Sequence, residues 1–556
     1  MNQTILILGA GLAGLAAALT AAEQQNKVYL ISAMPSERAQ SVMAEGGINA
    51  ALDTKGENDS PEEHFWDTIR AGVYLADPNA VRALTDAAPE IIRRLVSLGV
   101  VFNRDMHGNV DLRNFGGQKK KRTAFAMSST GKQIMTSLIQ AVLRWENQGS
   151  VIRYNDHTFV TLIFNHDNRC LGCVVRDNRT QKLLTLRGDA VIIATGGMNG
   201  LFGSTTGSLL NTGEVTAELF RLGLPIANGE FVQYHPTTVP CSGKRLLISE
   251  AARGEGGRLF ALRTGTPWYF MEENYPELGN LMPRDVVSRE IWQILNVPGE
   301  KRAVFLDMTQ LPLDVMEQKL GDLVDDCMTY LHIDPRREPI PISPGIHYFM
   351  GGIQVDESHQ TLFPRLYAAG ECCCQYHGAN RLGGNSTLGA IYGGIVAANA
   401  ALPEVANSLN DDFNAFAEQT LEDLRQRASS LQLGGRHFPL PGIRAELNAI
   451  LLDSLGIVRD GPRMEAGIRA IGRLIVEKVQ GNYDPAFEAD ENLNMESLCL
   501  LGKALLLSAC NRRESRGAHT RSDYPDLNDT DYRRYSVAQY RGDEILIHLE
   551  DIPQKR

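Results

Sequence analysis

The sequence has little that points to a membrane or secreted protein. Its one long uncharged stretch, residues 4–22, contains Gly9, Gly11 and Gly14, and no Lys or Arg precedes it. A signal peptide needs a positively charged start, and a membrane span needs about 20 mostly apolar residues. We therefore interpret this stretch as strand, turn and helix. We expect a cytoplasmic protein without direct membrane insertion.

Cysteine and basic charge are also scarce. The 556 residues include nine cysteines, an odd number that argues against a disulfide framework. No cysteine set has the spacing of an iron–sulfur cluster, and we expect no metal site in this chain. Lys and Arg number 55 against 66 Asp and Glu, for a net charge of −11, so a footprint for nucleic acid is excluded. The length predicts about three domains.

Glycine, by contrast, is abundant and clustered, with 52 residues. A short apolar run ends at Gly9, and Gly11 and Gly14 follow before an Ala/Leu-rich segment. In such a βαβ unit the first glycine permits a tight turn, the second lets a pyrophosphate approach the helix N-terminus, and the third lets helix and strand pack closely. The pattern predicts a dinucleotide site. Ser32 stands after the second strand, where a plain NAD site has an acidic residue, and this disfavours NAD.

Two later segments repeat the strand-and-glycine design. Residues 189–197 form a buried strand that ends at Thr195 and Gly196, and residues 366–371 end at Glu371. An acidic residue after such a turn can accept a hydrogen bond from a ribose or ribitol hydroxyl. Each segment alone is also compatible with an ordinary core strand. Together with the first motif they favour FAD, with a second domain inserted into a nucleotide fold.

A set of ordered motifs along nearly the whole chain resembles the flavoprotein subunits of succinate dehydrogenase and fumarate reductase, a superfamily that includes L-aspartate oxidase. The motifs are residues 41–50 (SVMAEGGINA), 113–117, 233–238, 249–257, 283–287, 347–352, 377–381, 380–388 (NRLGGNSTL) and 513–519. The resemblance implies an α/β fold: a Rossmann-like FAD-binding domain with an inserted α+β capping domain and a C-terminal helical domain. We place the FAD-binding domain at 1–234 and 351–410, the capping domain at 235–350, the helical domain at 411–525 and a C-terminal tail at 526–556.

The resemblance also implies roles for individual residues. Arg284 would move the proton, and Glu250 and Arg253 would relay it. A guanidinium acid is workable only if a carboxylate reloads it, because its pKa is above ~12. The substrate carboxylates would be bound by His235, Ser249, His347 and Arg381, with Phe115 beside them. The cofactor would be bound by Gly9, Gly11, Gly14, Ser32, Ser41, Glu45, Gly46, Gly47, Thr195, Gly196, Glu371, Asn385, Ser386 and Leu388.

Two departures from the family pattern separate its members. Many members carry a His, covalently bonded to the flavin, at the position of Gln40, so non-covalent FAD is expected here, and with it the reductive direction. Aspartate oxidases carry a Glu at the position of Phe115, where it meets the substrate ammonium. A phenyl ring leaves that charge unpaired, which favours an unsubstituted dicarboxylate. Ser249 replaces the usual Thr and keeps its hydroxyl.

The remaining segments carry simpler interpretations. Helical periodicity at 415–432, 464–479 and 495–509 predicts a C-terminal bundle, and 535–550 is typical of a strand pair or tail. Cys170 and Cys173 are interpreted as part of a β-hairpin, and Cys372, Cys373 and Cys374 as packing residues. The basic run 118–122 is read as a solvated turn, with an anionic approach path or docking patch as the alternative.

The sequence therefore predicts an FAD-dependent oxidoreductase that interconverts fumarate and succinate, with reduction favoured. Electrons would come from a donor protein or iron–sulfur subunit, through which the chain could sit peripherally on the inner membrane. The alternatives are L-aspartate oxidase, or a flavin-bearing subunit that is inactive outside a larger complex. A plain NAD-binding module is the weakest option because of Ser32.

Overall fold

The computed structural model describes residues 3–241, 243–401 and 412–554, and it opens with the expected βαβ unit. Strand β1 (Thr4–Leu8) leads through Gly9 into helix α1 (Leu12–Glu23), and β2 (Lys27–Ile31) returns parallel to β1. Eleven residues of α1 are buried. Its many alanines favour a helix and let it pack close to the sheet.

The first sheet is fully parallel, with the order β19-β10-β1-β2-β6. The strands other than β1 and β2 come from more distant parts of the chain: β6 (Val151–Tyr154), β10 (Ala190–Ile193) and β19 (Leu366–Ala368). Alternate residues of β1 enter opposite cores, as the pleat requires. Ile5 and Ile7 pack under α1, α4 (Thr130–Asn147) and α12 (Asn385–Ala401), and Leu6 and Leu8 pack on the other face. The Rossmann-like core is confirmed.

The other face carries a three-stranded antiparallel sheet of β7 (His157–Phe164), β8 (Cys170–Asp177) and β9 (Leu183–Arg187). Cys170 and Cys173 lie buried on β8, which pairs with β7, so the hairpin interpretation is confirmed. Burial raises the pKa of the Cys170 thiol to about 12, so it is held as an unreactive thiol.

Segment 48–124 covers one end of α12. It holds α2 (Pro61–Ala71), α3 (Pro78–Ser97) and a small sheet of β3 (Ile48–Asn49), β4 (Leu112–Arg113) and β5 (Thr123–Ala124). In the basic run, Arg122 is fully buried and pairs with Asp59 at 2.9 Å and Asp67 at 2.8 Å. Gln118 is also buried. Both ends of the run are therefore structural, whereas Lys119 and Lys121 between them are exposed, so the solvated-turn interpretation is wrong only for the ends.

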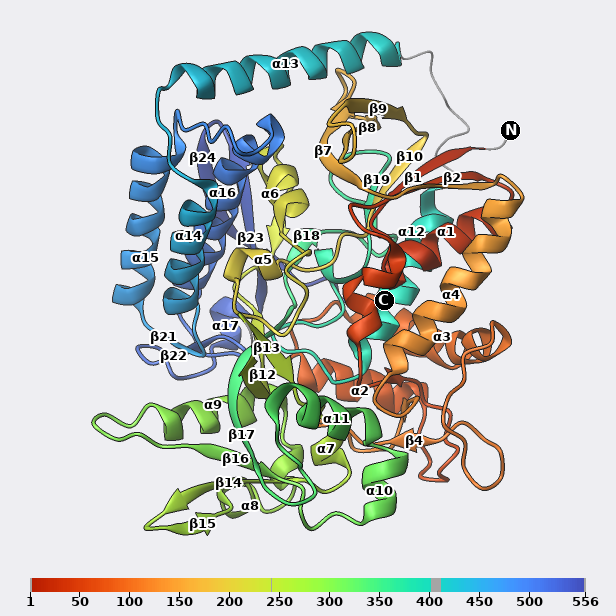
Figure 1. Ribbon diagram of the computed structural model, residues 1–556, viewed down its shortest axis with the longest axis vertical. Helices are drawn as coiled ribbons and strands as arrows, with labels where there is room; N and C mark the ends of the chain where they lie inside the picture. Colours follow the sequence, from red (N-terminus) through yellow and green to blue (C-terminus); the bar gives the residue numbers. More distant parts are fainter. Residues whose placement is uncertain (1–2, 242, 402–411, 555–556) are drawn as a thin grey trace.

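A six-stranded antiparallel sheet forms the inserted region at the bottom of Figure 1. Its order is β13-β12-β17-β16-β14-β15, with these bounds: β12 (Val232–Cys241), β13 (Lys244–Leu247), β14 (Arg258–Arg263), β15 (Thr266–Trp268), β16 (Val304–Asp307) and β17 (Ile340–Phe349). Around it lie α7 (Ala251–Gly254), α8 (Phe270–Asn274), α9 (Arg284–Leu295), α10 (Leu313–Gln318) and α11 (Gly321–Asp326). Helix α9 packs on the long β12–β17 pair. Residues of α9 and of this sheet form an apolar core of the inserted region.

The C-terminal region is helical, as the periodicity predicts. Helices α14 (Leu440–Ser454), α15 (Gly461–Leu474) and α16 (Ala489–Asn511) pack together at the left of Figure 1, and α13 (Phe413–Leu433) crosses the top over β7. A π-helical turn, Ile475–Val479, extends α15. Among the described helices, α16 alone is long and apolar enough to cross a membrane, but 72% of that window is buried, as in the core helix of a folded domain.

The last strands form a hairpin, β23 (Arg534–Arg541) and β24 (Glu544–Asp551), which completes a sheet with β11 (Ile226–Ala227), β18 (Gly352–Gln354) and β20 (Cys373–Cys374). The predicted strand pair at 535–550 is confirmed. The remaining elements are α5 (Asn199–Phe202), α6 (Glu214–Arg221), α17 (Asp529–Tyr532), β21 (Val458–Arg459) and β22 (Thr520–Arg521). The domain boundaries stay a prediction, and the predicted end of the FAD-binding domain, 402–410, lies outside the described residues.

Candidate active site

One cavity of about 1060 Å³ runs from the first glycine turn to the region under the six-stranded sheet. Its first end is shaped by missing side chains. A Cβ on Gly9, which has φ of +111°, would lie 2.2 Å from the Ala194 carbonyl oxygen, and one on Gly14 would lie 1.8 Å from the Gly9 oxygen. Gly9 and Gly11 line the cavity, and Gly14 packs behind them. The turn can therefore bring a ligand against the N-terminus of α1, where the N-cap residue Gly11 has no side chain to cap the helix.

The second and third glycine segments meet this turn, as predicted. Thr195, Gly196 and Glu371 all line the cavity. The hydroxyl of Thr195 is buried with no hydrogen-bond partner, and so is available to a ligand. Burial raises the pKa of Glu371 to about 7, although the Phe349 N–H donates to its carboxylate at 3.2 Å. The Thr195 hydroxyl and the Glu371 carboxyl could form hydrogen bonds with polar groups in the middle of a dinucleotide.

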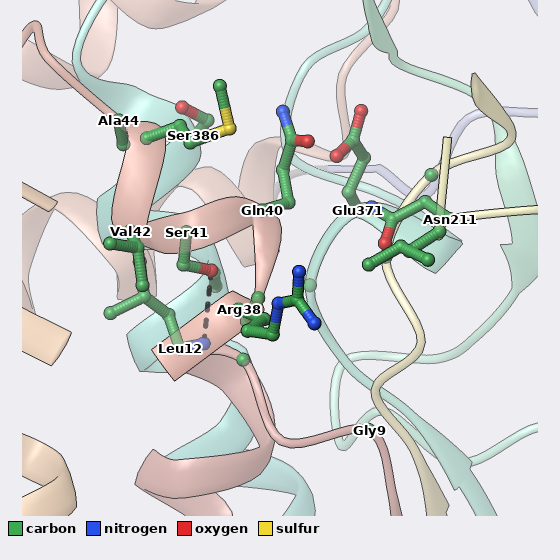
Figure 2. A pocket seen from close by; sticks show the side chains of 18 of the residues that line it. Gly9, Leu12, Arg38, Gln40, Ser41, Val42, Ala44, Asn211, Glu371 and Ser386 are labelled. Atoms are coloured by element: carbon green, nitrogen blue, oxygen red, sulfur yellow. Dashed lines mark hydrogen bonds between the residues drawn. The ribbon is translucent and has the colours of Figure 1, made fainter. Parts of the chain in front are cut away.

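Residues 40–47 form the adjacent wall (Figure 2). The hydroxyl of Ser41 accepts from the Leu12 N–H at 3.2 Å, which ties this wall to the start of α1. Gln40 lines the cavity, and its side-chain oxygen accepts a hydrogen bond from the Ser208 N–H. One oxygen of Glu45 is buried without a partner, and burial raises its pKa to about 8, with Asp326 adding to the effect. Ser32 lines the same end and donates to the Met34 carbonyl at 2.7 Å.

The 383–388 turn closes the cavity from the opposite side. Ser386 lines the cavity, whereas Leu388 is fully buried in the core beneath it. Asn385 faces away from the cavity and accepts from Asn49 at 2.8 Å, while its nitrogen donates to Thr68 at 2.9 Å. Asn385 and Leu388 thus support the turn rather than line the cavity.

At the other end of the cavity, Glu250 forms the centre of an ion cluster. Its side chain is 1% exposed and accepts from Arg284 Nε at 2.8 Å and Nη2 at 2.6 Å. Arg253 donates to its other oxygen at 3.1 Å, and the Gly116 N–H does so at 3.0 Å. Burial alone would raise the pKa of Glu250, but the two guanidiniums hold it at about 2. Glu250 is therefore ionised, and Arg253 lies behind it, outside the cavity lining.

Two histidines come from the paired strands β12 and β17. The rings of His235 and His347 lie 5.0 Å apart between centroids, next to a register shift in this pair. Burial and then the charge of Arg284 hold both pKa values well below 6.5, so both rings are neutral. Nε2 of His235 is buried without a partner, and Nδ1 of His347 lies 2.8 Å from the Thr206 hydroxyl.

Arg381 and Phe115 complete this end, with Ser249 also on the lining. Arg381 donates from Nη2 to the side-chain oxygen of Gln233 at 3.0 Å. Its Nε is buried without a partner, and burial together with Arg284 lowers its pKa to about 9. The ring of Phe115 is 1% exposed and packs against Gly46 and Gly383, where each glycine leaves no room for a Cβ.

Charge at this end is unbalanced. Two guanidiniums, Arg253 and Arg284, pair with one ionised carboxylate, Glu250, and a third, Arg381, has no ion pair among the described residues. Neutral His235 and His347 line the same space. A buried cavity with excess positive charge and unpaired donors suits a small dianion, since a charge is stable in such a place only when it is paired.

Comparison with known proteins finds relatives along nearly the whole chain. Residues 4–387 match the FAD binding domain family, and residues 444–555 match the fumarate reductase flavoprotein C-terminal family. The succinate dehydrogenase flavoprotein subunit of Bacillus subtilis is 38% identical, over 97% of this chain and 94% of that protein. The L-aspartate oxidase of Streptomyces coelicolor is 31% identical, over 99% and 94%. The FrdA chain of E. coli quinol fumarate reductase superposes with a TM-score of 0.90 at 29% identity, covering 99% and 97%.

The chain belongs to the succinate dehydrogenase/fumarate reductase flavoprotein family. It is thus an FAD-dependent oxidoreductase by family, as the motifs predict. The cavity fits FAD: Gly9 and Gly11 line it beside the N-terminus of α1, and the unpartnered Thr195 hydroxyl and Glu45 oxygen offer polar partners. Gly9, Gly11, Ser41, Thr195 and Glu371 would hold it.

Sequence reasoning missed two residues at the end of the cavity that contains Glu250 and Arg381. Gln233 is buried between Arg284 and Arg381, and Tyr348 lies under Arg381. Both stand in motifs quoted for the resemblance, beside His235 and His347. A charge-based search overlooks them because neither is ionised.

Proposed function

We propose that this flavoprotein interconverts fumarate and succinate and works in the direction of fumarate reduction. The Arg284–Glu250 pair carries the proposal, because it places a proton donor and an ionised carboxylate at one wall of a cavity with excess positive charge. Bound FAD would supply hydride exchange with one carbon of the substrate. The protein would manage the charge and the proton on the neighbouring carbon.

Substrate binding falls to the neutral and cationic donors. Arg381 would bind one carboxylate with a planar pair of N–H groups, and His235, His347 and Ser249 would donate to the carboxylates from compact groups. The unpartnered Nε2 of His235 and Nε of Arg381 are the free donors that such a ligand would satisfy. The positive charge of Arg284 and Arg381 would also stabilise negative charge that builds up on a carboxylate during reaction.

Arg284 would deliver the proton to the carbon next to the one that receives hydride. Losing it would leave a neutral guanidine beside ionised Glu250, at 2.6 Å. Because Glu250 is ionised, Arg253, 3.1 Å from its other oxygen, would first pass a proton to it, and Glu250 would pass a proton on to the Arg284 guanidine. Arg253 would then regain its proton from solvent. In the oxidative direction the same route would run backwards.

FAD is proposed to be bound without a covalent link. Gln40 lines the cavity at the position where the family carries its flavin-linked His, and an amide cannot form that bond. Acid precipitation should therefore release all the flavin into the supernatant. Yellow colour that stays with the protein pellet would contradict this.

The phenyl ring of Phe115 disfavours aspartate as the substrate, because it cannot pair with the substrate ammonium.

An electron-donor protein or an iron–sulfur subunit is proposed as the partner, since the described residues contain no cluster of ligands for a metal. The chain would then lie in the cytoplasm, or on the inner membrane through such partners.

The test is anaerobic turnover. FAD-loaded protein is mixed with reduced viologen and then fumarate, and viologen oxidation is followed. We expect fast oxidation, reduced about 10²- to 10⁴-fold in Arg284→Met, as for loss of a general acid. L-Aspartate with oxygen is run alongside. Aspartate turnover without fumarate turnover would reassign the chain as an aspartate oxidase, and a flavin-loaded protein silent with both would be an obligate subunit.

A further inference from the structure

Arg381 differs from the other guanidiniums of the site in what holds it. Arg284 and Arg253 both pair with the Glu250 carboxylate. Within the described residues, Arg381 forms no ion pair. Its guanidinium donates to the Gln233 side-chain oxygen at 3.0 Å and lies over the Tyr348 ring, with its central carbon 4.2 Å from the ring centroid. Both groups are neutral.

Gln233 is fixed in one orientation by four hydrogen bonds. Its oxygen accepts from Arg284 Nη1 and from Arg381 Nη2, each at 3.0 Å. Its nitrogen donates to the Asn380 side-chain oxygen and to the Arg381 carbonyl, each at 2.9 Å. One buried amide thereby sets the spacing between the guanidinium that would move the proton and the one that would bind a carboxylate.

Tyr348 is fixed from behind. It is the cross-strand partner of Gln233 in the β12–β17 pair. Its hydroxyl lies 3.2 Å from Nε2 of His377, and the two rings meet edge to face, 5.3 Å apart. Burial raises the pKa of Tyr348 well above 10 and lowers that of His377 well below 6.5, so both groups are neutral. The aromatic face attracts the guanidinium without cancelling its charge.

The neutral partners of Arg381 affect how the site binds a charged ligand. A carboxylate in place of the Gln233 amide would hold the two arginines more tightly but would cancel the positive charge that attracts a substrate dianion. The neutral Gln233 amide and Tyr348 ring hold the Arg381 guanidinium in place and leave its positive charge free to pair with the ligand.

We propose that Gln233 and Tyr348 are positioning residues that give the pocket its preference for dicarboxylates over monocarboxylates by holding Arg381 without a counter-charge. This rests on the proposed function, since it assumes that the ligand at this end of the cavity is a C4 dianion.

The experiment measures binding rather than turnover. The FAD-loaded protein is titrated at neutral pH with succinate and, separately, with butanoate, a monocarboxylate of the same chain length. The change in flavin absorbance gives the two dissociation constants, and their ratio reports charge selectivity. Flavin content and melting temperature show that each variant is folded.

The decisive variant is Gln233→Glu, which is nearly isosteric. We expect succinate affinity to fall about 10- to 100-fold, the range for loss of a hydrogen bond to a charged group, and butanoate affinity to fall less, so that the ratio collapses. The matched variant Gln233→Met removes the bridge without adding charge. It should lower the ratio, but less than Gln233→Glu does, because Arg381 loses its position but keeps its charge, and it should lower kcat for fumarate because Arg284 loses its support.

Tyr348 provides the independent arm. Tyr348→Phe keeps the ring face and should change succinate binding less than threefold, whereas Tyr348→Leu removes the face and should weaken it about 5- to 10-fold. A wild-type ratio in Gln233→Glu, or equal effects of Phe and Leu, would overturn the inference. Wild-type protein that does not prefer succinate to butanoate would overturn the proposed function as well.

Discussion

The two ends of the cavity are built on opposite principles. The end near α1 is formed by what is absent: glycines whose missing side chains let β1, α1 and the 194–197 turn pack closely beside the cavity. The end under the six-stranded sheet is formed by charged and polar side chains from β12, β17, α9 and the 377–384 segment. Hydrogen bonds join residues that lie 51 to 148 positions apart in the sequence. Backbone shape defines the first end, and side-chain charge defines the second.

This contrast predicts that the two ends fail differently. Damage to the glycine end should remove the cofactor and with it the colour of the protein. Damage to the charged end should leave a yellow protein that binds ligand but turns over slowly.

Glu250→Gln should give the largest effect at the charged end. The neutral amide keeps the shape but leaves Arg284 and Arg253 without a counter-charge and cannot return a proton, so kcat should fall about 10²- to 10⁴-fold. Loss of one partner of this buried cluster should also cost about 3–5 kcal/mol in the free energy of unfolding. Stopped-flow turnover and urea denaturation of the FAD-loaded protein measure these two effects.

Binding provides the control for that variant. Since one negative charge is lost, succinate should bind Glu250→Gln at least as tightly as it binds wild type, with full flavin content. Turnover within tenfold of wild type would show that Arg284 is reloaded by another route.

Gly9→Ala should give the corresponding failure at the glycine end. The new Cβ would lie 2.2 Å from the Ala194 oxygen, at a φ of +111°. Backbone strain of about 1–3 kcal/mol adds to this collision, so we expect flavin-depleted protein with a lowered melting temperature. Gly108→Ala is the matched control: its φ is +80°, but nothing lies within 4 Å of the new Cβ. It should keep its flavin, and equal flavin loss in both variants would contradict the steric explanation.

The same contrast explains what the sequence could predict. The glycine turns are local, because Gly9, Gly11 and the flanking strand and helix lie in one short segment, and their geometry follows from backbone sterics. The charged end required the resemblance, because His235, Arg284 and Arg381 come together only through the fold. Gln233 and Tyr348 escaped both kinds of reasoning, since their importance lies in partners that the sequence does not show. Asn385, expected at the cofactor, instead contacts Asn49 and Thr68 behind the wall.

The smallest expected effect tests the boundary between the two ends, where Glu45 faces Asp326 of the inserted region. Burial raises the pKa of Glu45 to about 8, with Asp326 as the next cause. In this pH range the folded protein holds a proton that the unfolded chain has released, so stability falls as pH rises from about 4.5 to about 8. Glu45→Gln carries no titrating group, and its melting temperature should fall less over that interval. Asp326→Asn should do the same to a smaller degree, because it removes only the second cause. If the melting temperatures of wild type and Glu45→Gln change in parallel with pH, Glu45 is solvated and ionised, and its protonation does not contribute to stability.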